Sequence, residues 1–409
     1  WASGNPARNL DTYMVDSSLV KETFFENSAS ADISIIEGNR GLYDGMDEGG
    51  THSSAELAKL LCVPVILVIN AAKVTRTVGA IVLGCQTLDP QVNIAGVIFN
   101  RVAGSRHESI LQKSLESICG IPAAGFIPKL KESDLLPGRH LGLVTPEENP
   151  HKEKLSAFLP EIAEKYLDLE LLEAIANTVE AADEIQPVFN PEVHASEVRI
   201  GCFSDSAFSF YYPENIEQLQ NAGAEIIEIS SLTTTALPEC DGLYIGGGFP
   251  ETHMRELSKN RSRMASVKEA AEDGLPIYAE CGGLMYLCDS LRWGDEEYPL
   301  AGIFPLKLAM EHKPQGHGYC EAVVDCENIY FDSRTVLKGH EFHYSRIIAG
   351  KDRVSTCFKI NRGSGSFDHR DGLIYKNVLA CYLHLHAQGC PDWANNFVEA
   401  ARRFRDEII

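Results

Sequence analysis

The stretch Pro276-Ile277-Tyr278-Ala279-Glu280-Cys281-Gly282-Gly283-Leu284-Met285-Tyr286-Leu287 decides how the second half of this chain folds. A short apolar run, a tight turn and an apolar helix start follow one another, with Cys281 at the turn. This order is typical of a nucleophile elbow. A helix N-terminus favours the thiolate form of a cysteine, and small neighbours leave the sulfur approachable. We therefore interpret Cys281 as a nucleophile rather than as a buried structural thiol.

A glycine-rich strand exit precedes this elbow. Residues 242–251 form an apolar run that passes into Gly246, Gly247 and Gly248. Without Cβ atoms, such a turn can approach a reacting carbonyl closely and aim backbone N–H groups at the oxyanion that develops there. Taken alone, the run is equally consistent with an ordinary turn, so its weight comes from the elbow that follows.

Two histidines follow the elbow near the end of the chain. Residues 378–386 form an apolar run that predicts one strand, with His384 and His386 two positions apart on the same face. A histidine is the commonest general base for a thiol nucleophile. One of these two side chains is therefore the expected base for Cys281.

Together the three segments resemble the class I glutamine amidotransferase domain, in which a cysteine and a histidine release ammonia from glutamine beside a glycine-rich oxyanion loop. In many members a glutamate two residues after the histidine orients it, and here that position is His386. The cobyrinic and cobyric acid amidases are the branch with Ala-Glu-Cys-Gly-Gly, a Tyr-Leu-His motif and no such glutamate. Resemblance to that branch selects His384 as the base and favours a structural role for His386. The oxyanion donors that it implies are Gly247, Gly248 and Gly282.

The first half of the chain alternates short β-branched runs with helical stretches, which predicts a parallel sheet with helices on both faces. The expected strands are residues 33–36, 63–69, 93–100 and 123–127, and the expected helices are residues 53–61, 75–88 and 108–119.

The second half opens a new α/β pattern. A Glu- and Leu-rich helical stretch over residues 152–182 leads into a segment interrupted by prolines. Beyond it we predict strands at residues 198–203 and 224–229, with a helix after Pro213. The fold class is therefore α/β, with two doubly wound domains. The predicted division is a first domain at residues 1–185, a linker at 186–197 and a second domain at 198–409.

Two acids follow the first predicted strand, at the edge where open α/β sheets bind their ligands. Glu37 suits a magnesium ligand, and Asp44 lies on a glycine-flanked loop suited to positioning a carboxylate or ammonia. Without further context, an exposed acidic loop is the better interpretation of both residues.

Residues 2–11, 37–61 and 92–102 resemble the synthetase domain of the cobyrinic acid a,c-diamide synthase family, and residues 208–215 and 339–345 extend the likeness. That domain is similar to dethiobiotin synthetase, a P-loop NTPase-type fold. The resemblance implies Mg²⁺ assisted by Glu37, an adenine contact from Asn100 and participation of Asp44 in amidation.

The resemblance also implies a reaction. ATP would phosphorylate the a and c acetate carboxylates of cobyrinate, and glutamine-derived ammonia would displace the phosphate to leave amides. This makes the expected enzyme a glutamine-hydrolysing carbon–nitrogen ligase of cobalamin biosynthesis.

One family feature is missing from the sequence. The chain has no G-x-x-x-x-G-K-[ST] motif, and its only Gly-Lys pair, Gly350-Lys351, is followed by Asp352. The family carries that loop upstream of the position matching Trp1. We therefore expect an N-terminally truncated member, with a crippled synthetase step and an intact glutaminase.

Three other interpretations stay open. The same chemistry could act on hydrogenobyrinate, nickel-sirohydrochlorin or siroheme. A non-catalytic tetrapyrrole-binding protein is the alternative if the P-loop is natively absent. A stand-alone glutaminase would release ammonia without ATP or tetrapyrrole.

Composition restricts the partners. A formal charge of −22 repels a phosphate backbone, which argues against nucleic acid. The longest apolar stretch, residues 60–69, is too short to cross a bilayer and no signal segment opens the chain, so we expect a cytoplasmic protein without a membrane partner. Twelve cysteines without a C-x-x-C pair predict reduced thiols and no zinc or iron–sulfur site. The expected partners are glutamine, ATP and a tetrapyrrole polycarboxylate, with a homodimer left open.

Overall fold

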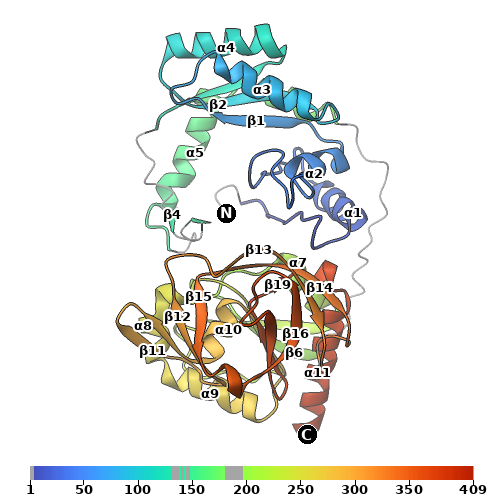
Figure 1. Ribbon diagram of the computed structural model, residues 1–409, viewed down its shortest axis with the longest axis vertical. Coiled ribbons are helices and arrows are strands. Elements are labelled where there is room, and N and C mark those ends of the chain that lie inside the picture. The colour runs from blue at the N-terminus through green and yellow to red at the C-terminus, as the bar shows by residue number, and fades with distance from the viewer. Residues whose placement is uncertain (1–3, 131–137, 140–141, 144–147, 180–196, 409) are drawn as a thin grey trace. The chain divides into compact units, whose positions relative to one another are not determined.

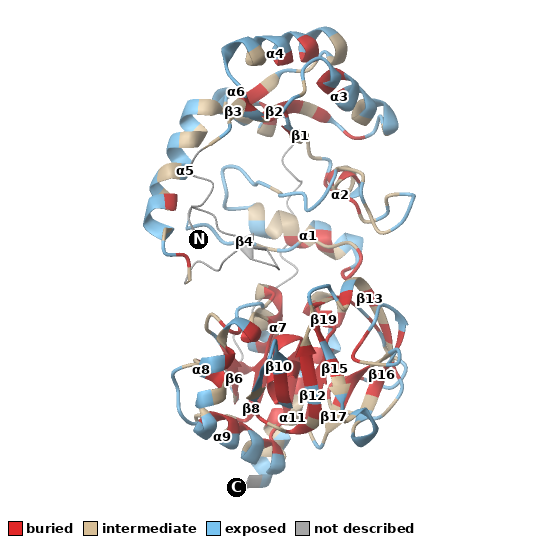
Figure 2. Cartoon of the chain, turned by 60° about the vertical axis from the view of Figure 1, so that its left-hand side comes forward, coloured by how far each residue is buried: buried red, intermediate tan, exposed pale blue. Residues whose placement is uncertain are grey.

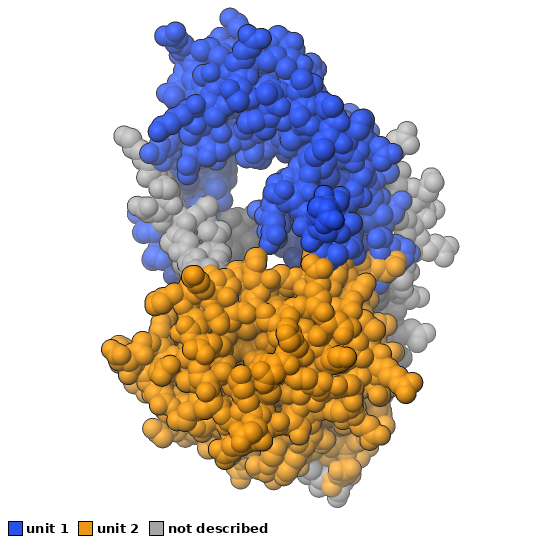
Figure 3. All heavy atoms as spheres, in the orientation of Figure 1, with its two compact units in different colours: residues 1–12, 17–188 blue, residues 13–16, 189–409 orange. Residues whose placement is uncertain are grey.

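The computed structural model describes residues 4–130, 138–139, 142–143, 148–179 and 197–408. The chain divides into two compact units, which Figure 3 colours separately. Unit 1 comprises Trp1–Thr12 and Ser17–Val188, and unit 2 comprises Tyr13–Asp16 and Phe189–Ile409. The predicted linker at residues 186–197 lies outside the described residues except for Glu197.

Unit 1 is built on a parallel three-stranded sheet, with strand order β1-β2-β3 (Figure 1). Its strands are β1 (Val65–Asn70), β2 (Ile94–Val102) and β3 (Ala123–Pro128), with a small hairpin of β4 (Gly138–Arg139) and β5 (Gly142–Leu143). Its helices are α1 (Ser17–Ser28), α2 (Ser54–Leu61), α3 (Thr77–Leu88), α4 (Ser105–Cys119), α5 (Lys152–Tyr166) and α6 (Leu169–Ala176). Three of the four predicted strands and all three predicted helices between them are confirmed to within a few residues.

Helices cover both faces of this sheet. Val78 of α3 and Leu111 of α4 pack with Val97 and Phe99 of β2 in one buried cluster. On the other face, a side chain at Gly96 would lie 3.4 Å from Ile175 of α6, so that helix packs closely on the strand. The alternation of strands and helices in the sequence therefore produces the doubly wound arrangement that was predicted.

The predicted strand at residues 33–36 is wrong. These residues have no strand conformation, and the side chain of Ile35 is 91% exposed. β-Branched residues form a strand only where a neighbouring strand completes the hydrogen-bond ladder and one face is buried, and the described chain provides neither here. Glu37 consequently does not follow a strand of the sheet.

Unit 2 contains a ten-stranded mixed sheet in the order β19-β14-β13-β16-β17-β18-β9-β8-β6-β7, and a second sheet in the order β11-β10-β12-β15. The strands are β6 (Val198–Phe203), β7 (Ala224–Ile229), β8 (Gly242–Ile245), β9 (Ile277–Glu280), β10 (Cys288–Trp293), β11 (Glu296–Pro299), β12 (Phe304–Met310), β13 (Gly316–Val324), β14 (Val336–His343), β15 (Ser345–Ala349), β16 (Ser355–Arg362), β17 (Arg370–Tyr375), β18 (Val378–Cys381) and β19 (His384–Leu385). The helices are α7 (Pro213–Asn221), α8 (Met254–Lys259), α9 (Arg261–Glu272), α10 (Gly282–Leu287) and α11 (Asp392–Ile408), with 3₁₀ turns η2 (Pro250–His253), η3 (Lys351–Arg353) and η4 (Ala387–Gly389).

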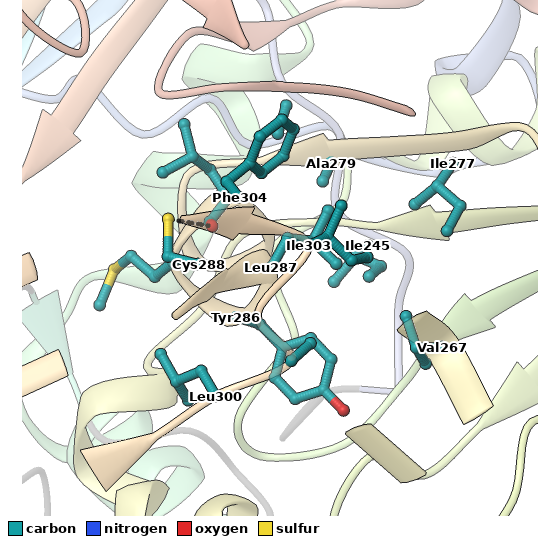
Figure 4. Close-up of a cluster of buried hydrophobic side chains, with 14 of the residues drawn as sticks. Ile245, Val267, Ile277, Ala279, Tyr286, Leu287, Cys288, Leu300, Ile303 and Phe304 are labelled. Atoms are coloured by element: carbon teal, nitrogen blue, oxygen red, sulfur yellow. Dashed lines mark hydrogen bonds between the residues drawn. The ribbon is translucent and has the colours of Figure 1, made fainter. Parts of the chain in front are cut away.

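The parallel part of the large sheet, from β18 to β7, includes the strands predicted at residues 198–203 and 224–229. Strands β6, β8, β9 and β18 are buried along nearly their whole length, as Figure 2 shows for β6 and β8, whereas edge strand β7 is buried only at its two ends. One apolar cluster joins the parallel strands to α10 and to the second sheet, with Ile245, Ala279, Leu287 and Phe304 among its members (Figure 4). The core of unit 2 therefore packs directly around α10.

The prediction of one continuous strand over residues 378–386 is also wrong. β18 ends at Cys381, and the chain then crosses to pair β19 with β14. The carboxylate of Asp371 accepts hydrogen bonds from the backbone N–H groups of Tyr382 and Leu383. A buried acid thus takes the donors that a sheet ladder would have used, and the strand breaks there.

A short segment early in the chain belongs to unit 2. The Tyr13 hydroxyl donates to the carbonyl of Cys320, and its ring stacks on Tyr319 at 4.3 Å between centroids. The backbone of Met14 passes so close to Gly389 that a side chain there would lie 2.1 Å from the Met14 carbonyl oxygen. We predicted a single boundary between the domains, at residues 186–197, so the inclusion of Tyr13–Asp16 in unit 2 was not expected.

None of the helices in the described chain is both long and apolar enough to cross a bilayer.

We expect Gly283→Ala to destabilise unit 2, because a Cβ at this position of α10 would lie 2.2 Å from the carbonyl oxygen of Ile245. Overpacking of this kind costs about 1–3 kcal/mol. Gly84→Ala, at an exposed position of α3, is the matched control, because nothing lies within 4 Å of its added Cβ and helix propensity favours alanine by about 1 kcal/mol. Thermal melting should move down for the first variant and not for the second. Equal melting temperatures for Gly283→Ala and wild type would contradict the packing described for α10.

Candidate active site

Cys281 occupies the turn between β9 and α10. Its φ of 47° and ψ of −97° are unusual for a residue other than glycine. The Cys281 N–H donates to the carbonyl of Cys381 at 2.7 Å, which ties the turn to neighbouring β18. Strained backbone held in place by a sheet is the geometry of a nucleophile elbow. The predicted strand, turn and helix are therefore present, with the thiol at the point of reversal.

The glycine-rich exit from β8 lies against this turn. A Cβ at Gly282 would be 3.3 Å from the backbone nitrogen of Gly248, which shows how closely the two loops approach. Within the described residues, the Gly248 N–H has no hydrogen-bond partner. Gly248 and Gly282 therefore lie close together at the turn that carries Cys281.

Gly247 has a different position from the one predicted. Its N–H donates to the carbonyl of Phe210 at 3.2 Å, so this donor is already engaged. A Cβ at Gly247 would lie 2.4 Å from Cε1 of His384. In this conformation the glycine makes room for the imidazole instead of presenting a free N–H group.

His384 lies on β19 and is 4% exposed. Its ring is held between the edge of Phe210, at 4.9 Å, and the parallel ring of His340, at 4.8 Å. Burial lowers the pKa of His384, but electrostatic attraction to the nearby Cys281 and Glu280 side chains outweighs burial and raises the pKa to about 10. The structure therefore places the imidazole of His384 close to Cys281, as a base and nucleophile pair would require.

Glu280 is a residue of this site to which the sequence analysis assigned no role. It is 2% exposed, and its Oε2 lies 3.7 Å from Nδ1 of His384. The carboxylate accepts hydrogen bonds of 3.2 Å from three neutral donors, the hydroxyls of Tyr244 and Tyr278 and the N–H of Leu385. The available signal was its position directly before the nucleophile, since an acid at the end of an otherwise apolar strand is buried with it.

His386 has its own carboxylate partner. Its Nε2 lies 3.5 Å from Oε2 of Glu214, and its ring packs against Tyr212 at 4.8 Å. The residue is buried at the start of η4, where its Nδ1 accepts the N–H of Gln388. These contacts are those of a residue that fixes the chain after β19.

The three candidate residues of unit 1 are not joined by any contact in the described part of the chain. Glu37 and Asp44 are exposed, and the Asp44 carboxylate folds over Gly41. Asn100 is partly buried and lies opposite Asn70 at the carboxyl ends of β1 and β2. Among the residues described, no group of three or more His, Cys, Asp or Glu side chains is arranged to hold a metal ion.

The sequence matches two family models. Residues 199–391 match the CobB/CobQ-like glutamine amidotransferase domain, which includes Cys281, Glu280 and His384. Residues 6–135 match an AAA domain, which includes β1, β2 and β3. The first match agrees with the geometry of the cysteine site, and the second agrees with a parallel sheet wound with helices.

Similar curated proteins cover nearly the whole chain. A cobyrinate a,c-diamide synthase of Magnetococcus marinus is 39% identical over 96% of this chain and 85% of its own length. One of Archaeoglobus fulgidus is 39% identical over 98% of this chain and 87% of its own length. Among solved structures, PurLQS from Thermotoga maritima is 14% identical with a TM-score of 0.38, over 51% of this chain and 98% of that one.

We expect the rate at which iodoacetamide labels Cys281 to change little between about pH 7 and 9. The raised pKa of His384 keeps its imidazolium charge throughout this range, and the charge stabilises the thiolate. In His384→Gln the charge is gone, so labelling should increase steeply with pH, by up to about tenfold per unit. Peptide mass spectrometry separates Cys281 from exposed Cys62, which serves as the internal reference. Parallel pH profiles in the two proteins would exclude the ion pair.

Proposed function

Because the chain belongs to the cobyrinate a,c-diamide synthase family, we propose that it amidates the a and c acetate carboxylates of cobyrinate with ammonia taken from glutamine. The enzyme is a glutamine-hydrolysing carbon–nitrogen ligase. The observation that carries the proposal is the strained elbow at Cys281 after β9, with the buried imidazole of His384 close enough for Cys281 to raise its pKa.

In the glutaminase reaction, the Cys281 sulfur attacks the side-chain carbonyl carbon of glutamine. The S–C bond forms, the C–N bond breaks, and ammonia leaves with the proton that His384 supplies. The oxyanion would be met by the N–H groups of Gly282, which follows Cys281 in the chain, and of Gly248, whose nitrogen would lie 3.3 Å from a Cβ at Gly282. Water then hydrolyses the thioester, with His384 taking its proton, and glutamate leaves.

The synthetase reaction belongs to unit 1. ATP transfers its terminal phosphoryl group to a substrate carboxylate, and ammonia attacks the resulting acyl phosphate to give an amide and inorganic phosphate. Activation is required because a carboxylate oxygen is too poor a leaving group for ammonia to displace. The match of residues 6–135 to an AAA domain supports ATP use.

The residues that we propose for the nucleotide are Asn100 and Glu37. Asn100 pairs with Asn70 near the carboxyl ends of the parallel strands. Open α/β folds bind their ligands at these ends, so the position suits an adenine contact. The exposed carboxylate of Glu37 fits Mg²⁺, because this ion is commonly held by one or two carboxylates together with substrate phosphates. When bound, Mg²⁺ would neutralise charge on the transferring phosphoryl group.

The substrate is tested by offering the enzyme cobyrinate, hydrogenobyrinate, nickel-sirohydrochlorin and siroheme in turn, with glutamine and Mg-ATP. Mass spectrometry should show two successive conversions of a carboxylate to an amide with cobyrinate. Diamide formation from one of the other macrocycles alone would replace cobyrinate as the proposed substrate. Glutamate release without any macrocycle or ATP requirement would favour a stand-alone glutaminase.

Cys281→Ala should abolish amidation that uses glutamine, by at least about a thousandfold, because no thioester can form. Amidation that uses ammonium salt at mildly alkaline pH should persist, since the thiol takes no part in activating the carboxylate. Product formation from each nitrogen source is the measurement, and Cys288→Ala, which changes another buried thiol in the same unit, is the control. Loss of both reactions in folded Cys281→Ala protein would point to a structural role for the cysteine.

Asp44→Asn should impair the synthetase reaction and leave the glutaminase reaction intact. The exposed Asp44 carboxylate lies on a loop of unit 1, and we propose that it positions ammonia or the acceptor carboxylate. The variant should retain glutamine hydrolysis and lose amide formation from glutamine and from ammonium alike, by about a hundredfold or more. Asp47→Asn, on the same loop, is the matched control for amide formation. An unchanged yield of diamide in Asp44→Asn would return this residue to the role of an exposed loop acid.

A further inference from the structure

Glu280 is an acid buried at the end of an apolar strand, and an ionised carboxylate in such a place needs both hydrogen bonds and a positive partner. The hydrogen bonds come from Tyr244, Tyr278 and Leu385. Burial, with Glu280 contributing, keeps the pKa of both tyrosine hydroxyls well above their usual value, so they remain neutral donors. The hydrogen-bond donors therefore bring no charge.

The positive partner is His384. Its Nδ1 is buried, has no hydrogen bond within the described residues, and lies 3.7 Å from Oε2 of Glu280. Catalytic hydrogen bonds are often this long before substrate binds and shorten afterwards. With Nδ1 turned to the carboxylate, Nε2 is the nitrogen left to face the thiol of Cys281.

We propose that Glu280 is the positioning residue of the glutaminase site, holding the imidazole of His384 with Nε2 toward Cys281. This inference rests on the proposed function of that site. The carboxylate fixes which imidazole nitrogen carries the proton and stabilises the imidazolium. The position two residues after His384, occupied by His386, is therefore not the source of the orienting charge.

The local backbone explains how two neighbouring residues serve one histidine. Successive side chains of a regular strand point to opposite faces, so Glu280 and Cys281 would diverge in an extended chain. The positive φ of Cys281 breaks that alternation at the end of β9. Both side chains can then contact the same imidazole, the acid at Nδ1 and the thiol on the other side.

Three other buried acids of unit 2 have different partners. Glu341 accepts the N–H groups of Ser364 and Gly365, and Asp371 accepts those of Tyr382 and Leu383. Glu214 faces His386. Within the described residues, Glu280 is the carboxylate that forms an ion pair with His384.

The proton balance follows from this arrangement. His384 gives its proton to the departing amine when the thioester forms, and takes a proton from water when the thioester is hydrolysed. The imidazolium is thus lost and regenerated once in each cycle. Removing the charge of Glu280 destabilises the imidazolium and lets the ring adopt the wrong tautomer, so kcat should fall while KM for glutamine changes little.

Glu280→Gln keeps the size of the side chain and removes its charge. Glutamine hydrolysis should lose about 10²–10⁴ in kcat, and the labelling of Cys281 by iodoacetamide should lose its flat pH profile. Amidation from ammonium should be unchanged. Glu214→Gln is the matched control, because it neutralises the carboxylate of another buried acid–histidine pair, and it should hydrolyse glutamine at the wild-type rate.

Glu280→Asp retains the negative charge, but its side chain is one methylene shorter and holds the carboxylate farther from His384. Its kcat should therefore lie between those of Glu280→Gln and wild type, about tenfold below wild type. The proposal is overturned by wild-type kcat in folded Glu280→Gln, or by an equal loss in Glu214→Gln. Where Glu280→Gln does not fold, wild-type kcat in Glu280→Asp overturns it equally. If instead the proposed function is wrong, wild type and Cys281→Ala should hydrolyse glutamine at the same rate.

Discussion

The positive φ of Cys281 is the constraint on which the rest of unit 2 depends. A residue other than glycine in this conformation costs about 1–3 kcal/mol and persists only where its surroundings fix it. Three features fix it: the hydrogen bond from Cys281 to Cys381, the packing of α10 in the core shared by both sheets, and the absence of a side chain at Gly283. The fold thus stabilises a backbone that would otherwise relax, and the reactive thiol is the residue held there.

Much of this arrangement could be predicted from the sequence where the signal was local. The elbow was recognisable because a strand pattern, a cysteine and two glycines follow one another within residues 276–287. The parallel strands β1, β2 and β3 were recognisable because each is a short apolar run bounded by helical stretches. In both cases neighbouring residues specify the structure that they adopt.

The features that the sequence did not predict correctly depend instead on partners that are distant in sequence. Residues 33–36 have strand-forming side chains but no ladder to join in the described chain. The run over residues 378–386 is interrupted by Asp371, which no pattern within the run reveals. The environment of Glu280 combines Tyr278 of the same strand with Tyr244 and His384 from two distant places in unit 2. Only the folded sheet brings these groups to one carboxylate.

The passage of Tyr13–Asp16 into unit 2 has a consequence for how the chain can be divided. Tyr13 stacks on Tyr319, and Met14 lies against Gly389 of η4, close behind the strand that carries His384. A gene fragment beginning at residue 189 would encode the sheet and the cysteine but omit this segment, leaving the ring of Tyr319 uncovered. The amidotransferase half is therefore discontinuous in sequence. An exchange of this module between genes by a single crossover at residue 189 would leave behind Tyr13–Asp16, which lies between the two sequence segments of unit 1.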